Sequence, residues 1–219
     1  MPTDPSTPAN AGLLAAWNRL LPRQEAMGAA LLERYAEPHR HYHDTGHLAA
    51  VLGWIEALAG DHDLFLVRLG AWFHDAVYAI PPGQLSNEEA SARLARRELG
   101  RAGLEQEDIN EVARLVRLTA THRPGARDPE GELLCDADLA VLAGSAEEYA
   151  AYVAAVRAEY AAVPEEEFLA GRLAVLTELA EGPLFRTPKG RDLEDRAQAN
   201  LAAEIADLTA RLEDRLAGS

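Results

Sequence analysis

Apolar residues recur along most of the chain with the three-to-four-residue period of α-helices. After the polar segment EPHRHYHDTG, for example, one helix face carries Leu48, Val51, Leu52, Ile55 and Leu58. No segment shows the strict alternation that is typical of a half-buried β-strand. Helices are predicted over residues 11–20, 23–36, 64–79, 107–122, 132–143, 145–162, 165–180 and 192–216, with two more beginning near His47 and Ser86. The pattern therefore predicts an all-α bundle of about nine or ten helices.

Local signals set several of these boundaries. Ser86 precedes Glu89 by three residues, and Ser145 precedes Glu148 by three, which is the signature of a helix N-terminal capping box. Two prolines and a glycine after Ile80 end the preceding apolar helix. Residues 1–10 carry three prolines and no apolar run, so we expect a disordered tail followed by a single domain over residues 11–219.

Composition excludes several classes of function. The net charge of −15 argues against binding to a nucleic acid polymer, which requires a basic surface. No run of about 18 apolar residues is present, so no membrane span is predicted. A single cysteine, Cys135, cannot form an intrachain disulfide and fits a cytoplasmic location. The sequence does not indicate an oligomeric state.

The stretch GAWFHDAVYAI places His74 and Asp75 inside an otherwise apolar helix. Burying a carboxylate is costly unless the group is paired or binds a metal ion. His47 lies on the inward stripe of its own helix, and Asp138 shares a face with Leu134 and Val141, whereas Asp136 is less clearly inward. Two imidazoles and two carboxylates suit a divalent metal ion, but these residue types alone also allow core histidines and helix-capping aspartates.

Four segments in this order, RHYHDTGHL, AWFHDAVY, THR and CDADLAVL, resemble the HD-domain superfamily of metal-dependent phosphohydrolases, and the resemblance extends over roughly residues 10–212. It implies an HD-type helical bundle and a metal site formed by His47, His74, Asp75 and Asp138. Asp136 would then orient a ligand. The metal is a divalent ion, either Mn, Fe, Co, Ni, Zn or Mg, and one tightly held ion is favoured, with a second possible through Asp75 and waters.

Further roles follow from the same resemblance. YHDTGH is similar to an element of cyclic-nucleotide phosphodiesterases in which the first histidine protonates the leaving oxygen, so His43 is the expected general acid and Asp75 the residue that orients the attacking water. Asp44 replaces an asparagine of that element and is alternatively a helix cap, and the alternative for His43 is then a solvated loop histidine. Arg40, Tyr78 and His122 are the expected substrate contacts, with surface charge, packing and helix capping as the respective alternatives.

The resemblance implies hydrolysis of a small phosphoester, with a nucleotide-related substrate, by metal-activated water. Leu139 stands where several triphosphohydrolases of the superfamily have a lysine, which argues against a triphosphate. The alternative function is a non-catalytic HD module that senses a nucleotide.

Overall fold

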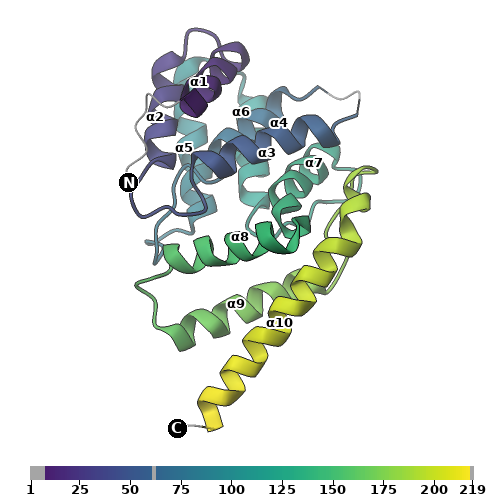
Figure 1. The fold of residues 1–219 in the computed structure, drawn as a ribbon. Helices are drawn as coiled ribbons and strands as arrows, with labels where there is room; N and C mark the ends of the chain where they lie inside the picture. Colours follow the sequence, from purple (N-terminus) through teal and green to yellow (C-terminus); the bar gives the residue numbers. More distant parts are fainter. Residues whose placement is uncertain (1–7, 61–62, 218–219) are drawn as a thin grey trace. The chain divides into compact units, whose positions relative to one another are not determined.

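The computed structural model describes residues 8–60 and 63–217, and every regular element within them is a helix. The all-α prediction is thereby confirmed, with ten α-helices and two short 3₁₀ helices in this part of the chain (Figure 1). The chain divides into two compact units at the Asp138–Leu139 peptide bond. The prediction that residues 11–219 form one domain stays a prediction.

The first unit contains most of the helices. They are α1 (Pro8–Leu20), α2 (Glu25–Tyr35), α3 (Thr45–Leu58), α4 (Phe65–Phe73), α5 (Asn87–Ala102), α6 (Gln106–Leu118) and α7 (Pro129–Leu139). Helix α1 begins at Pro8, inside the predicted tail of residues 1–10, because proline is well tolerated at the first position of a helix. Residues 1–7 lie outside the described residues.

The core of the first unit is built around α4. Trp72 of α4 is fully buried, with its ring edge-to-face against Trp17 of α1 at 5.0 Å between centroids. Helices α5 and α6 contribute to the same core through residues such as Leu99 and Val112, which are both fully buried. Aromatic and aliphatic burial on this scale is the main stabilising contribution to the fold.

Helix α4 ends at Phe73, and the predicted extension to Ala79 was wrong. Residues 74–77 form turns and bends, and side chains from α5 pair with backbone groups of Val77 and Ala79. The Ser91 hydroxyl accepts from the Val77 amide (2.9 Å) and donates to its carbonyl (3.3 Å). The Asn87 side chain pairs in the same way with Ala79 (3.0 and 3.2 Å). At Val77 and Ala79 these bonds take the place of the helical ladder.

The second unit contains η1 (Ala140–Ala143), α8 (Ala146–Glu159), α9 (Glu165–Ala180), η2 (Gly190–Leu193) and α10 (Glu194–Ala217). The segment predicted as one helix over residues 132–143 is therefore α7 followed by a 3₁₀ turn. Ser145 and Glu148 form the predicted capping box at the start of α8. Helices α9 and α10 lie side by side (Figure 1) around Leu169, Leu176 and Leu201, which are fully buried.

A polar network lies inside this second unit. The Arg172 guanidinium donates to Glu204 (2.8 and 3.1 Å) and to the Tyr152 hydroxyl, and the Tyr149 hydroxyl donates to the same glutamate.

Among the helices of residues 8–60 and 63–217, none combines the length and the apolar composition that a single membrane-crossing segment requires.

Candidate metal centre

His47 is positioned by the start of α3. Asp44 is the N-terminal cap of this helix, and its Oδ1 accepts hydrogen bonds from the amides of Gly46 (2.7 Å) and His47 (3.2 Å). The capping alternative for Asp44 therefore agrees with the structure. Because the cap fixes the first turn, the His47 side chain enters the interior from the N-terminal end of α3, where it is buried.

His74 and Asp75 directly follow the last residue of α4. The Nδ1 atom of His74 lies 2.8 Å from the Ala71 carbonyl oxygen. A carbonyl can only accept, so this contact places a proton on Nδ1 and directs Nε2 into the cluster, where it can bind a metal ion in place of a second proton. An imidazole held in this way by a backbone carbonyl is the usual arrangement of a metal-binding histidine.

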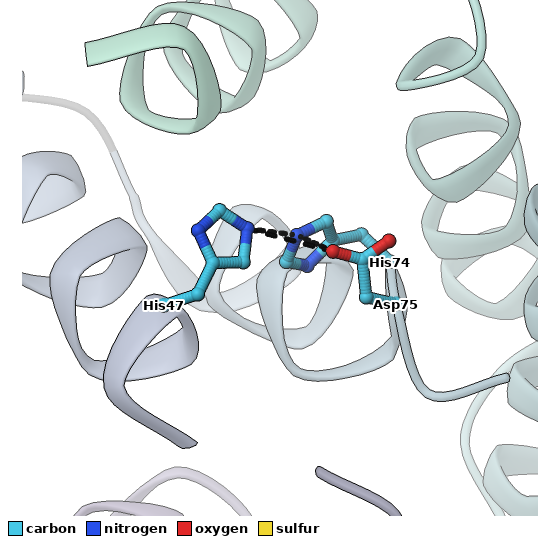
Figure 2. A group of neighbouring side chains, drawn as sticks. All are labelled: His47, His74 and Asp75. Atoms are coloured by element: carbon cyan, nitrogen blue, oxygen red, sulfur yellow. Dashed lines mark hydrogen bonds and ion pairs between the residues drawn. The ribbon is translucent and has the colours of Figure 1, made fainter. Parts of the chain in front are cut away.

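The side chains of His47, His74 and Asp75 converge on one point (Figure 2). The two Nε2 atoms face each other at 3.1 Å. Asp75 Oδ2 lies 3.0 Å from Nε2 of His74 and 3.4 Å from Nε2 of His47. Asp138, in the last turn of α7, adds a fourth group, with Oδ1 at 3.1 Å from His47 Nε2 and 3.6 Å from His74 Nε2.

These separations match the coordination sphere of a transition metal. Metal–ligand distances of about 2.0–2.2 Å place neighbouring donor atoms of a tetrahedral or octahedral site about 2.8–3.6 Å apart. The five separations above fall between 3.0 and 3.6 Å. Two imidazole nitrogens and two carboxylate oxygens are also a donor set that Mn, Fe, Co, Ni and Zn accept. The residues present therefore fit a divalent metal ion.

Electrostatics in the metal-free protein reflect the same crowding. Burial alone would raise the pKa of Asp75, but His74, His43 and His47 lower this pKa well below its usual range. Burial opposes the charged form of His74, yet Asp75 and the other neighbouring acids raise the pKa of this imidazole well above its usual value. The same balance lowers the pKa of Asp138. Both carboxylates are therefore available as anionic ligands at neutral pH.

His43 lies in the turn before α3, next to this cluster. Its ring stacks on Tyr78 with 4.1 Å between centroids and 23° between planes, and the centroid of the His47 ring lies 5.6 Å away. The centroid of the Tyr42 ring lies 4.8 Å from the ring centroid of His43 and 4.8 Å from that of His47. The structure thus brings the predicted general acid and Tyr78 to the edge of the metal site.

Arg40, which was predicted to contact the substrate, is buried among other groups of the protein. Its side chain is fully buried, and the guanidinium donates to the carbonyl oxygens of His43 (2.9 Å) and Asp75 (2.7 Å) and to the Glu37 carboxylate (3.1 Å). These donors are used by the protein itself. The structure therefore favours a structural role for Arg40 over contact with a substrate phosphate.

His122 lies in the turn after α6 with a positive φ of 51°, which is uncommon for any residue other than glycine, although histidine adopts it more often than most. Its Nε2 lies 2.9 Å from Oδ2 of Asp138, the carboxylate oxygen opposite the one that faces His47. His122 therefore orients a predicted ligand. Strain of this kind persists where the surrounding structure needs the side chain in one direction.

Tyr35 was not singled out by the sequence. Its hydroxyl lies 3.3 Å from the Asp75 amide and 3.4 Å from the carbonyl oxygens of Ala71 and Trp72, and burial raises the pKa of Tyr35 to about 12. Nothing in the local sequence around Tyr35 distinguishes it from a core tyrosine, because its partners lie some 40 residues away. Asp136, which the helical pattern placed less clearly inward than Asp138, is fully buried.

Comparison with known proteins identifies the domain that contains these residues. No curated protein sequence matches the chain. The crystal structure of Bacillus subtilis YpgQ in complex with ADP aligns with 83% of this chain and 96% of its own, at 18% sequence identity and a TM-score of 0.45. The family model of the HD domain matches residues 40–141, which contain all four predicted ligands. Residues 40–141 of the chain are therefore identified as an HD domain.

Proposed function

We propose that the protein is a metal-dependent phosphohydrolase that cleaves a small phosphoester. The observation that carries this proposal is the convergence of His47, His74 and Asp75, whose donor atoms have the separations of a metal coordination sphere, with Asp138 Oδ1 3.1 Å from Nε2 of His47. The HD-domain match over residues 40–141 supports the same class of chemistry.

In this proposal the four side chains share the tasks of holding the ion and orienting water. His47, His74 and Asp138 hold the ion, and Asp75 both binds the ion and orients the attacking water. A divalent ion at this site supplies Lewis acidity toward a phosphoryl oxygen and a water of lowered pKa. Because the site lies among buried side chains, the fixed charges of Asp75 and Asp138 act with little screening.

His43 is the proposed general acid. It lies next to the ligand His47 and is close enough to Asp75 to lower the pKa of that carboxyl group. A group at this position can reach the leaving oxygen of an ester whose phosphate binds the ion. Stacking on Tyr78 restricts the His43 ring to one plane, which favours a fixed direction for proton transfer.

The nucleotide-related substrate is also a proposal and rests on the resemblance to other HD proteins. The half-buried rings of Tyr42 and Tyr78 beside His43 support it, because a base can stack on an aromatic side chain. A cytoplasmic location remains part of the proposal, since the buried thiol of Cys135 is free.

The decisive experiment is metal analysis of the purified full-length protein together with a panel of phosphoesters. The panel contains nucleoside monophosphates, cyclic nucleotides, dinucleotides and sugar phosphates, each assayed with Mn, Co, Ni, Zn and Mg. The ligand variants His74→Ala and Asp75→Ala are measured in parallel. The matched control is His41→Ala, which removes an exposed histidine from the loop before α3.

The proposal expects metal-dependent release of phosphate or nucleoside by the wild type and the control, and none by the ligand variants. Nucleotide binding without turnover under every metal would instead establish the sensor function. A wild type that binds neither metal nor phosphoester would refute both.

A further inference from the structure

Arg40 connects two backbone segments that carry different parts of the site. Its Nη1 donates to the carbonyl oxygen of His43, in the turn before α3, and to that of Asp75, in the turn after α4. Its Nη2 lies 3.5 Å from the Ala76 carbonyl oxygen. One planar group therefore sets the distance between two segments that are more than 30 residues apart in sequence.

The guanidinium is itself held on several sides. Glu37, three residues earlier, accepts a hydrogen bond from Nε at 3.1 Å. The central carbon of the guanidinium lies 5.2 Å from the centroid of the Tyr35 ring and 5.6 Å from that of Tyr78. Both distances are within the range of cation–π attraction. Hydrogen bonds and ring contacts together offset the cost of burying this charge.

Arg40 also reaches the His43 side chain by a second route. The Tyr78 ring that lies near the guanidinium stacks on the His43 imidazole. The backbone of Tyr78 is fixed in turn by His39, whose Nε2 lies 2.8 Å from the Tyr78 carbonyl oxygen. Removing the guanidinium would therefore release both the His43 carbonyl and the ring on which His43 stacks.

We propose that Arg40 is a positioning residue that fixes the general acid His43 relative to the metal ligand Asp75. It acts through backbone carbonyls and through Tyr78, and it does not touch the substrate. This inference rests on the proposed function, in which His43 protonates the leaving oxygen.

The test compares two phosphoesters that differ only in their need for a proton. A p-nitrophenyl ester releases p-nitrophenolate, a leaving group that is stable without a proton, whereas an alkyl ester needs protonation of its leaving oxygen. General acid catalysis typically contributes about 10²–10⁴ in rate. At saturating metal, His43→Ala should lower kcat for the alkyl ester far more than kcat for the nitrophenyl ester. Arg40→Ala should lower the ratio of the two kcat values, alkyl over nitrophenyl, in the same direction and by about tenfold or more.

Two further variants separate positioning from general stability. Arg40→Lys keeps the charge but loses the planar fork, so its shift in the ratio should lie between those of the wild type and Arg40→Ala. Arg172→Ala removes another buried, hydrogen-bonded arginine and should lower stability while leaving the ratio unchanged. If Arg40→Ala does not fold, Arg40→Lys alone carries the comparison.

Amide hydrogen exchange provides a readout that is independent of activity. Loss of Arg40 should accelerate exchange in both backbone segments, residues 41–44 and 75–79, while the α9 and α10 amides keep wild-type rates. Wild-type exchange in either segment, or an alkyl-to-nitrophenyl ratio that stays unchanged in both Arg40 variants, would overturn the inference. A wild type that hydrolyses no ester refutes the proposed function, and the exchange measurement then still decides whether Arg40 fixes the two segments.

Discussion

The imidazole of His122 lies 2.9 Å from Oδ2 of Asp138, on the carboxylate oxygen that does not face His47. Asp138 thus has one oxygen directed at the proposed metal position and the other held by a histidine from the end of α6. Removing an outer partner of a metal ligand typically costs about 10–100-fold in metal affinity. We expect His122→Ala to weaken metal binding by about that factor, measured by calorimetric titration of the chelator-treated protein.

The positive φ of His122 allows a sharp control. Glycine accepts this backbone conformation without strain, so His122→Gly removes the imidazole and relieves the backbone together. If the imidazole is responsible, both variants lose affinity alike. Wild-type affinity in His122→Gly would assign the loss in His122→Ala to backbone strain.

The buried ion pair of the second unit gives a prediction about stability. Arg172 and Glu204 are 11% and 7% exposed at the side chain, and the glutamate also accepts from Tyr149. Breaking one side of a buried pair leaves the other charge uncompensated and typically costs about 3–5 kcal/mol. We expect Arg172→Ala to lower the free energy of unfolding by about this amount in urea titrations monitored by circular dichroism.

Replacement of both partners tests the origin of that cost. The double variant Arg172→Met with Glu204→Leu has no uncompensated charge, so it should recover most of the lost stability. A double variant as unstable as Arg172→Ala would show that the pair itself, rather than an orphaned charge, stabilises the helix pair.

Two helical glycines should respond in opposite ways to alanine. At Gly28, a Cβ atom would lie 2.6 and 2.7 Å from ring atoms of the buried Trp17, so Gly28→Ala should destabilise the protein by about 1–3 kcal/mol through overpacking. Gly53 in α3 is exposed and has no neighbour within 4 Å of that position, so Gly53→Ala should stabilise by about 0.5–1 kcal/mol. Thermal unfolding of both variants checks the prediction, and equal changes in Tm would contradict it.

Glu89 links α5 to α6 and provides a prediction about pH. Hydrogen bonds from Arg117 and Arg93 lower its pKa from 4.5 to about 2. A carboxylate whose pKa is depressed by folding stabilises the protein above its unfolded pKa, and this contribution is lost as the pH falls through the folded pKa. Glu89→Gln should therefore cost no more than about 1 kcal/mol at pH 7, because the pair is partly exposed.

The difference between Glu89→Gln and the wild type should shrink as the pH falls from about 4.5 toward 2 and vanish below it. Denaturant titrations at several pH values measure this trend. Glu88→Gln, at the neighbouring position of the same helix turn, controls for the change in net charge. A difference that stays constant with pH would assign the effect of Glu89→Gln to packing.

Much of the fold could be read from the sequence because its helices carry clear apolar stripes and caps. Helix α9 begins and ends at the predicted residues, and Ser145 caps α8 as expected. The end of α4 could not be read in this way, since residues 76–80, AVYAI, are as apolar as the helix before them. What ends the helix is a set of partners elsewhere in the chain, such as Ser91 and Asn87.

The candidate site, too, could be predicted from the sequence only in part. Local periodicity indicated that His47 and Asp138 point inward, and the resemblance to HD proteins grouped them with His74 and Asp75. Spacing alone gave no reason for the four to meet. The role of Arg40 was not foreseen, because the sequence shows an arginine near a motif but does not show the carbonyl groups that it contacts.

The early end of α4 also determines how far this motif can be transplanted. His74 keeps helical backbone angles as the C-cap of α4. The carbonyl oxygens of the three residues after it accept hydrogen bonds from Arg40 and Ser91 in place of amides of a continuing helix. A designer who grafts only the His-Asp dipeptide onto a longer regular helix would lose these partners, and must graft the arginine and the serine as well.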